Sequence, residues 1–207
     1  EGGEMIIPGA QTRVIDAGTV SDISLAGVPA GAYAAELVAD QPVTAAAAVT
    51  RIGGPSPDDP DQRLVDRAWI PAAAEVASAL IPLPSYGDHV SSASVVVANP
   101  GREPIGLQYR VAKAGGWVES AAVVSVPARS AVVLERDELA GAVGVELVAV
   151  RAATAGSGDR AEEAEVAGLV AAVVLVSESA GGPLIAAVSA QPDLEAARSV
   201  DVRLPNR

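Results

Sequence analysis

Short apolar segments, separated by turn-forming residues, run along almost the whole chain. Valine, isoleucine, leucine and alanine alternate with polar residues, and glycine, proline, asparagine or aspartate recurs about every 8–12 residues. This spacing is typical of an antiparallel β-sandwich, in which each strand turns one face to the core. It predicts an all-β, immunoglobulin-like antiparallel β-sandwich with strands at 12–16, 20–25, 32–39, 43–51, 64–70, 76–82, 92–98, 105–112, 117–126, 130–135, 144–151, 167–177, 183–190 and 198–204.

Two segments depart from this alternation. The longest charge-free apolar run, at 166–177, is about half as long as a membrane-spanning helix, so it predicts a strand buried on both faces. For the alanine-rich segment at 71–80 a helix is the alternative to the strand at 76–82, because the segment begins with a proline, which is well tolerated at the first helical position.

An internal repeat indicates how the strands are grouped. Residues 7–16 resemble 126–135, and residues 39–48 resemble 179–187. In the first pair the matching prolines, Pro8 and Pro127, are 119 residues apart, and in the second pair Pro42 and Pro183 are 141 residues apart. The later copy therefore carries an insertion of about 22 residues. The polar stretch at about 152–165, which has no strand pattern, is the simplest place for it.

The repeat predicts two related units. Residues 1–52 correspond to the back half of a β-sandwich unit, and residues 63–207 to a complete immunoglobulin-like unit with the insertion. Between them, 53–62 is rich in proline and aspartate, which disfavour a central strand and predict a linker.

Composition removes several functional classes. The formal net charge of −12 disfavours nucleic acid and anionic membrane surfaces, both of which need clustered lysine and arginine. The absence of cysteine excludes disulfides and thiolate metal sites. The first residues lack the basic region of a secretory signal, as in a mature or excised fragment of a longer protein, and no membrane span is expected in this fragment.

Several motifs follow one another in a recognisable order. A strand ends in Asn99-Pro100-Gly101, a second strand follows, and then come a Val126-Pro127 corner and a closing Pro-hydrophobic-Ala-Ala strand at 182–187. Together with Trp69-Ile-Pro, this order resembles an actinobacterial exported protein family known as domain of unknown function 5719, which has tandem immunoglobulin-like modules. The resemblance covers most of 63–190 and, more loosely, 5–50; the insertion departs from it.

The resemblance implies an exported β-sandwich of the cell envelope or extracellular space, within a longer membrane-anchored or secreted protein. It supplies no catalytic residues and no cofactor. The leading hypothesis is therefore a non-catalytic structural or adhesive module whose partner is an unknown protein or polysaccharide of the cell envelope. A carbohydrate-binding module is the alternative, and a hydrolase that uses His89 is the second alternative.

The hydrolase hypothesis depends on His89, the only histidine in the chain. Any catalytic triad must include it, yet it lies in an expected turn, and the sequence has no Gly-x-Ser-x-Gly nucleophile motif. The acidic residues Glu162, Glu163 and Glu165 could act as paired carboxylates only on a rigid scaffold, which an exposed loop does not provide. We therefore expect no enzyme.

Two binding hypotheses remain. Asp58, Asp59 and Asp61 carry the oxygen ligands that Ca²⁺ prefers, but their spacing is not that of an EF-hand, so an acidic loop without metal is the simpler interpretation. Trp117 follows two glycines at an expected hairpin and is the candidate for an exposed ligand-binding ring. Trp69, beside an isoleucine and a proline, is expected to pack into the core.

Overall fold

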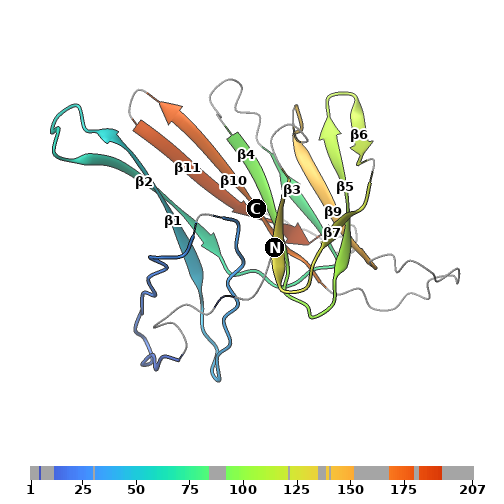
Figure 1. Cartoon of the computed structure of the whole chain (residues 1–207), viewed down its shortest axis with the longest axis horizontal. Helices are drawn as coiled ribbons and strands as arrows, with labels where there is room; N and C mark the ends of the chain where they lie inside the picture. The colour runs from blue at the N-terminus through green and yellow to red at the C-terminus, as the bar shows by residue number, and fades with distance from the viewer. Residues whose placement is uncertain are drawn as a thin grey trace, which may run out of the picture.

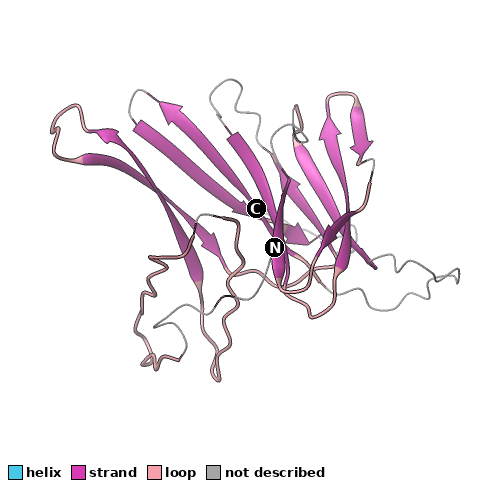
Figure 2. Cartoon of the chain, in the orientation of Figure 1, coloured by secondary structure: helices cyan, strands magenta, loops and turns pink. Residues whose placement is uncertain are grey.

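Twelve β-strands make up the fold in the described part of the chain, and Figures 1 and 2 show their arrangement. The computed structural model describes residues 5, 12–29, 31–83, 92–120, 122–134, 139, 141–151, 168–179 and 182–192. The strands are β1 (Ala46–Pro55), β2 (Arg63–Pro71), β3 (Ser78–Pro82), β4 (Ser92–Asn99), β5 (Ile105–Lys113), β6 (Gly116–Glu119), β7 (Val124–Val126), β8 (Ser130–Leu134), β9 (Gly144–Arg151), β10 (Val170–Ser179), β11 (Gly182–Ser189) and β12 (Gln191–Pro192).

The strands form two main antiparallel sheets and a separate hairpin. One sheet has the order β11-β10-β4-β8, and the other has the order β12-β3-β9-β5-β6, with β7 pairing β5. Strands β1 and β2 pair only with each other and extend to one side of the molecule (Figure 1). Consecutive strands β4 and β5 lie in different sheets, so the chain crosses from one layer to the other at Asn99-Pro100-Gly101. The predicted all-β antiparallel sandwich is confirmed.

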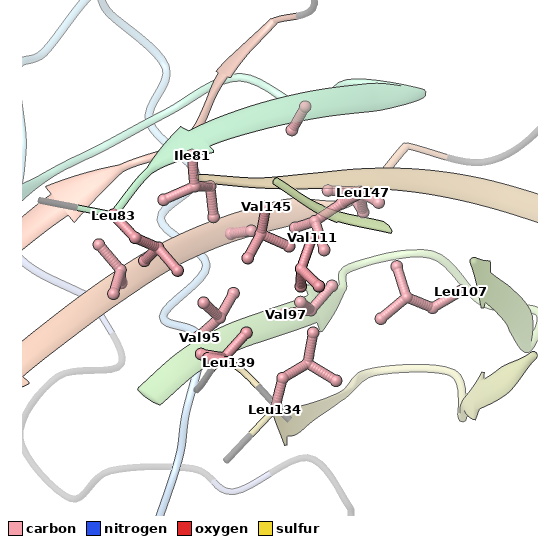
Figure 3. Packing of buried hydrophobic residues seen from close by; sticks show 14 of the residues in the cluster. Ile81, Leu83, Val95, Val97, Leu107, Val111, Leu134, Leu139, Val145 and Leu147 are labelled. Atoms are coloured by element: carbon pink, nitrogen blue, oxygen red, sulfur yellow. The ribbon is translucent and has the colours of Figure 1, made fainter. Parts of the chain in front are cut away.

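Alternation along each strand creates the core. In β10, Ala171, Val173 and Leu175 are buried, while the residues between them are half-buried. Their counterparts in the facing sheet include Val145 and Leu147 of β9, and Figure 3 shows the buried side chains of both sheets meeting in one layer. Small branched side chains fill this layer without any phenylalanine. The second face of β10, expected to be buried as well, is only half covered.

Asn99 ties the crossing between the sheets to the β7–β8 corner. Its side chain is 1% exposed. The amide Nδ2 donates to the carbonyl oxygens of Glu103 (2.8 Å), Val126 (3.1 Å) and Pro127 (3.2 Å), and Oδ1 accepts from the backbone N–H of Gly101 at 2.9 Å. The Asn-Pro-Gly turn and the Val-Pro corner, separate motifs in the sequence, therefore form one hydrogen-bonded junction.

The β1–β2 hairpin packs its inner face against the edge strand β11. Asp66 accepts a hydrogen bond from the backbone N–H of Ile185 at 2.7 Å. Arg51 and Glu178 form an ion pair beside this contact. The backbone of Gly53 lies directly on the ring of Pro183, where an added Cβ would be 2.4 Å from Cδ.

We expect Gly53→Ala to lower the free energy of unfolding by about 1–2 kcal/mol, because the new methyl group must push the hairpin away from the Pro183 ring. Gly54→Ala is the matched control, since an added Cβ there meets no atom within 4 Å. Urea unfolding of the two variants measures the difference. Equal stabilities would contradict the packing of the hairpin on β11.

Several sequence-based expectations were wrong. The strands predicted at 12–16, 20–25 and 32–39 are absent, because a strand needs a neighbour to pair its backbone groups and the described residues provide none there. Two turns replace them, closed by Thr19 N–H to Asp16 O (3.1 Å) and Val28 N–H to Leu25 O (3.2 Å).

The strand predicted at 76–82 is confirmed as β3, and the alternative of a helix at 71–80 is wrong. Its second half belongs to β3, where Ala79 and Ile81 enter the core and the backbone pairs with β9. Pairing with a distant strand thus outweighs the local helical preference of alanine.

The predicted division into units stays a prediction. The segment 53–62 comprises the last residues of β1 and the loop of the β1–β2 hairpin. The predicted repeat gains no support from 39–45, which has no strand although its counterpart forms β11. The insertion at 152–165 and the strand expected at 198–204 lie outside the described residues. None of the described residues belongs to a helix long and apolar enough to cross a membrane.

Candidate ligand-binding face

Trp117 lies on the outer face of the β9-β5-β6 sheet. A two-residue turn at 114–115 joins β5 to β6, and the register places Trp117 opposite Ala112 and Glu119 opposite Arg110. In β5, Leu107 and Val111 are buried, so the alternating residues between them point outward. Trp117 therefore shares the outer face with Arg110 and Glu119.

Arg110 links the ring to the neighbouring strand. Its guanidinium carbon lies 4.7 Å from the centroid of the Trp117 ring, which is the geometry of a cation–π contact. Its Nε donates to the carboxylate of Glu146 on β9 in an ion pair. Arg110 thus contacts Trp117 on one side and Glu146 on the other, and it covers one face of the Trp117 ring. Trp117 remains 47% exposed.

This arrangement suits a polar ligand with an apolar face. The exposed part of the indole offers a flat surface for stacking, and the exposed Glu119 offers an acceptor for hydroxyl groups. The Glu146 side chain is 14% exposed and pairs with Arg110. One arginine against two glutamates gives the three charged side chains a formal net charge of −1, which disfavours anionic ligands. A neutral sugar ring matches both features.

The expectation that Trp69 packs into the core is wrong. Trp69 is 58% exposed, because the inner face of β2 is formed by Leu64, Asp66, Ala68 and Ile70. The alternation of β2 could have predicted this exposure. Trp69 is two residues from Arg67, so both side chains lie on the same, outer face of the strand.

The three aspartates of the metal hypothesis lie in the exposed loop between β1 and β2. Asp59 accepts a hydrogen bond from the backbone N–H of Asp61 at 3.1 Å, as in an ordinary turn. The part of the chain that the structure describes holds no group of three acidic or histidine side chains arranged around a possible metal ion. The geometry thus gives a calcium site no support.

His89 and the acidic residues Glu162, Glu163 and Glu165 lie outside the described residues. Sequence reasoning chose Trp117 but missed its partners Arg110, Glu119 and Glu146. The two-residue turn gives the pairing of β5 with β6, so Arg110 could have been found from spacing alone, whereas Glu146 comes from a distant strand.

Comparison with known proteins gives a family but no function. No curated protein and no solved structure matches the chain. The sequence profile of the Family of unknown function (DUF5719) matches residues 1–137, a range that extends from the start of the given sequence to just beyond β8. This range includes the Asn-Pro-Gly turn and the Val-Pro corner that Asn99 joins. The match supports the resemblance seen in these motifs, and the chain belongs to this family of unknown function, DUF5719.

Proposed function

We propose that the chain is a non-catalytic, adhesive β-sandwich module of an exported cell-envelope protein. Its recognition surface is the outer face of the β9-β5-β6 sheet around Trp117. The observation that carries this proposal is the half-exposed ring of Trp117, held by Arg110 on an open sheet face.

The ligand class follows from the same side chains. Adhesion to an envelope surface needs either a protein or a polysaccharide partner, and a fixed indole beside the exposed carboxylate of Glu119 favours a polysaccharide. The local charge favours a neutral one. A carbohydrate-binding role, the second candidate function, is thus the specific form of the adhesive role that Trp117 supports.

We expect Trp117→Ala to weaken binding to a neutral cell-wall polysaccharide by at least about tenfold, which corresponds to about 1.4 kcal/mol. Loss of the stacking surface is the physical reason. Affinity electrophoresis against a panel of neutral and anionic polysaccharides gives the measurement. Because the chain has two tryptophans, Trp69→Phe leaves Trp117 as the single fluorophore for a direct titration.

Leu184→Ala is the matched control, since it removes a large apolar side chain of similar exposure, 49% against 47%, from β11 of the other sheet. Binding by the control and loss of binding by Trp117→Ala support the proposal. If no neutral polysaccharide in the panel binds the unaltered protein, or if Trp117→Ala binds as tightly as the unaltered protein, the proposal is wrong.

A further inference from the structure

The outer face of the β1–β2 hairpin carries large apolar side chains that nothing in the described chain covers. Ile52 and Val65 lie directly opposite each other in the register and are 66% and 56% exposed, and Trp69 follows on the same face. We call this surface the hairpin face: Ala46, Ala48, Thr50 and Ile52 of β1 with Arg63, Val65, Arg67, Trp69 and Pro71 of β2.

The hairpin face is positively charged within an acidic protein. It contains Arg63 and Arg67 and no acidic residue, whereas the whole chain has a formal charge of −12. Arg67 donates from Nε to the hydroxyl of Thr50 at 3.1 Å, so its side chain reaches across the hairpin face to β1. Tryptophan and arginine among aliphatic residues are the composition of interface cores.

The chain also contains a segment of the opposite charge that has no partner strand. Residues 12–29 and 31–45, here called the extended segment, form no strand in the described structure. Val14, Val20 and Val38 are almost fully exposed there. Between residues 12 and 45 the sequence has one arginine against four acidic residues, a formal charge of −3.

We propose that the extended segment of a second copy of this chain packs on the hairpin face, so that two copies exchange their segments. The apolar residues of the segment cover Ile52, Val65 and Trp69, and its acidic residues lie near Arg63 and Arg67. The hairpin face is positively charged and the extended segment is negatively charged, so the two surfaces are complementary. Because every copy carries both surfaces, two copies can make the same contact twice, which favours a second copy over other acidic proteins.

The topology explains why the segment does not cover the hairpin face of its own chain. Glu36 forms an ion pair with Arg129, which lies one residue before β8. Strand β8 is at one edge of its sheet, and β11, on which the hairpin packs, is at the opposite edge. The end of the segment runs directly into β1, where Ala45 accepts a hydrogen bond from the backbone N–H of Ala72 at 2.9 Å. The part around Glu36, in contrast, is held beside β8, at the sheet edge opposite the one on which the hairpin packs.

Light scattering coupled to size exclusion tests the assembly, and we expect the mass of a dimer. Trp69→Glu and Val65→Glu should each raise the dissociation constant of the dimer by at least about tenfold, since each places a carboxylate in the apolar contact. Val118→Glu, at an exposed position on β6, is the control and should leave the mass unchanged. Unchanged far-ultraviolet circular dichroism shows that the variants fold.

Crosslinking identifies the surfaces, because the native chain has no cysteine. Mixing Val38→Cys chains with Ile52→Cys chains under oxidation should give a covalent heterodimer, whereas Val38→Cys mixed with Val143→Cys should not. Three results would overturn the proposal: a monomeric mass at every concentration, no heterodimer between the first two variants, or a Val38→Cys/Ile52→Cys double variant that closes its disulfide within one chain. None of these results bears on polysaccharide binding at Trp117, so the two proposals fail independently.

Discussion

Replacing Asn99 with alanine is expected to lower the free energy of unfolding by about 3 kcal/mol, a large effect for one polar side chain. The amide of Asn99 serves three carbonyl oxygens and one backbone N–H, and the side chain is 1% exposed. The alanine variant loses one buried hydrogen bond, to Val126, and three partly buried ones, to Glu103, Pro127 and Gly101. Urea unfolding provides the measurement.

Two further substitutions locate the origin of the loss. Asn99→Asp keeps an oxygen for the N–H of Gly101 but removes the donors, so most of the loss should remain. Ser130→Ala removes a single exposed hydrogen bond to Pro127 at the same corner and should cost no more than about 1 kcal/mol. An alanine variant within about 0.5 kcal/mol of the unaltered protein would show that the junction does not stabilise the fold.

Leu147→Ala is expected to have the largest effect, a loss of about 2–5 kcal/mol. Leu147 is fully buried at the middle of β9, between β3 and β5, and faces the opposite sheet (Figure 3). Truncation removes transfer free energy and leaves a cavity that rigid paired strands cannot close.

The control for this variant is Leu80→Ala on the neighbouring strand β3. Leu80 pairs with Glu146 and is 40% exposed on the outer face, so its loss should cost less than about 1 kcal/mol. Thermal and urea unfolding of both variants give the comparison. Similar losses at the two positions would mean that the core does not lie between the two sheets.

Most of the sandwich was predictable because its strands carry local signals. The predictions at 92–98, 105–112 and 144–151 match β4, β5 and β9 to within a residue at each end, since valine-rich alternation ends there at proline, glycine or charged residues. The long strand predicted at 117–126 forms two strands, β6 and β7.

What failed depends on partners that are distant in the sequence. The alternation at 12–16 and 20–25 resembles that of true strands, but only a neighbouring strand turns such a pattern into a sheet. The Asn-Pro-Gly motif predicts a turn, yet the bonds of Asn99 to Val126 and Pro127 join residues more than twenty positions apart. For the candidate site, the sequence identified Trp117. The contact between Arg110 and Glu146 could be found only from the register of β5 and β9.

The carboxylate of Asp66 protects part of the edge strand β11 from pairing with another molecule. An edge strand with unsatisfied backbone groups can recruit an edge from a neighbouring molecule and grow into a larger sheet. At β11 the N–H of Ile185, which points away from β10, already donates to Asp66, and Gly53 and Leu64 pack over the first residues of the strand. Neighbouring copies of the chain are therefore not expected to join their sheets through this edge.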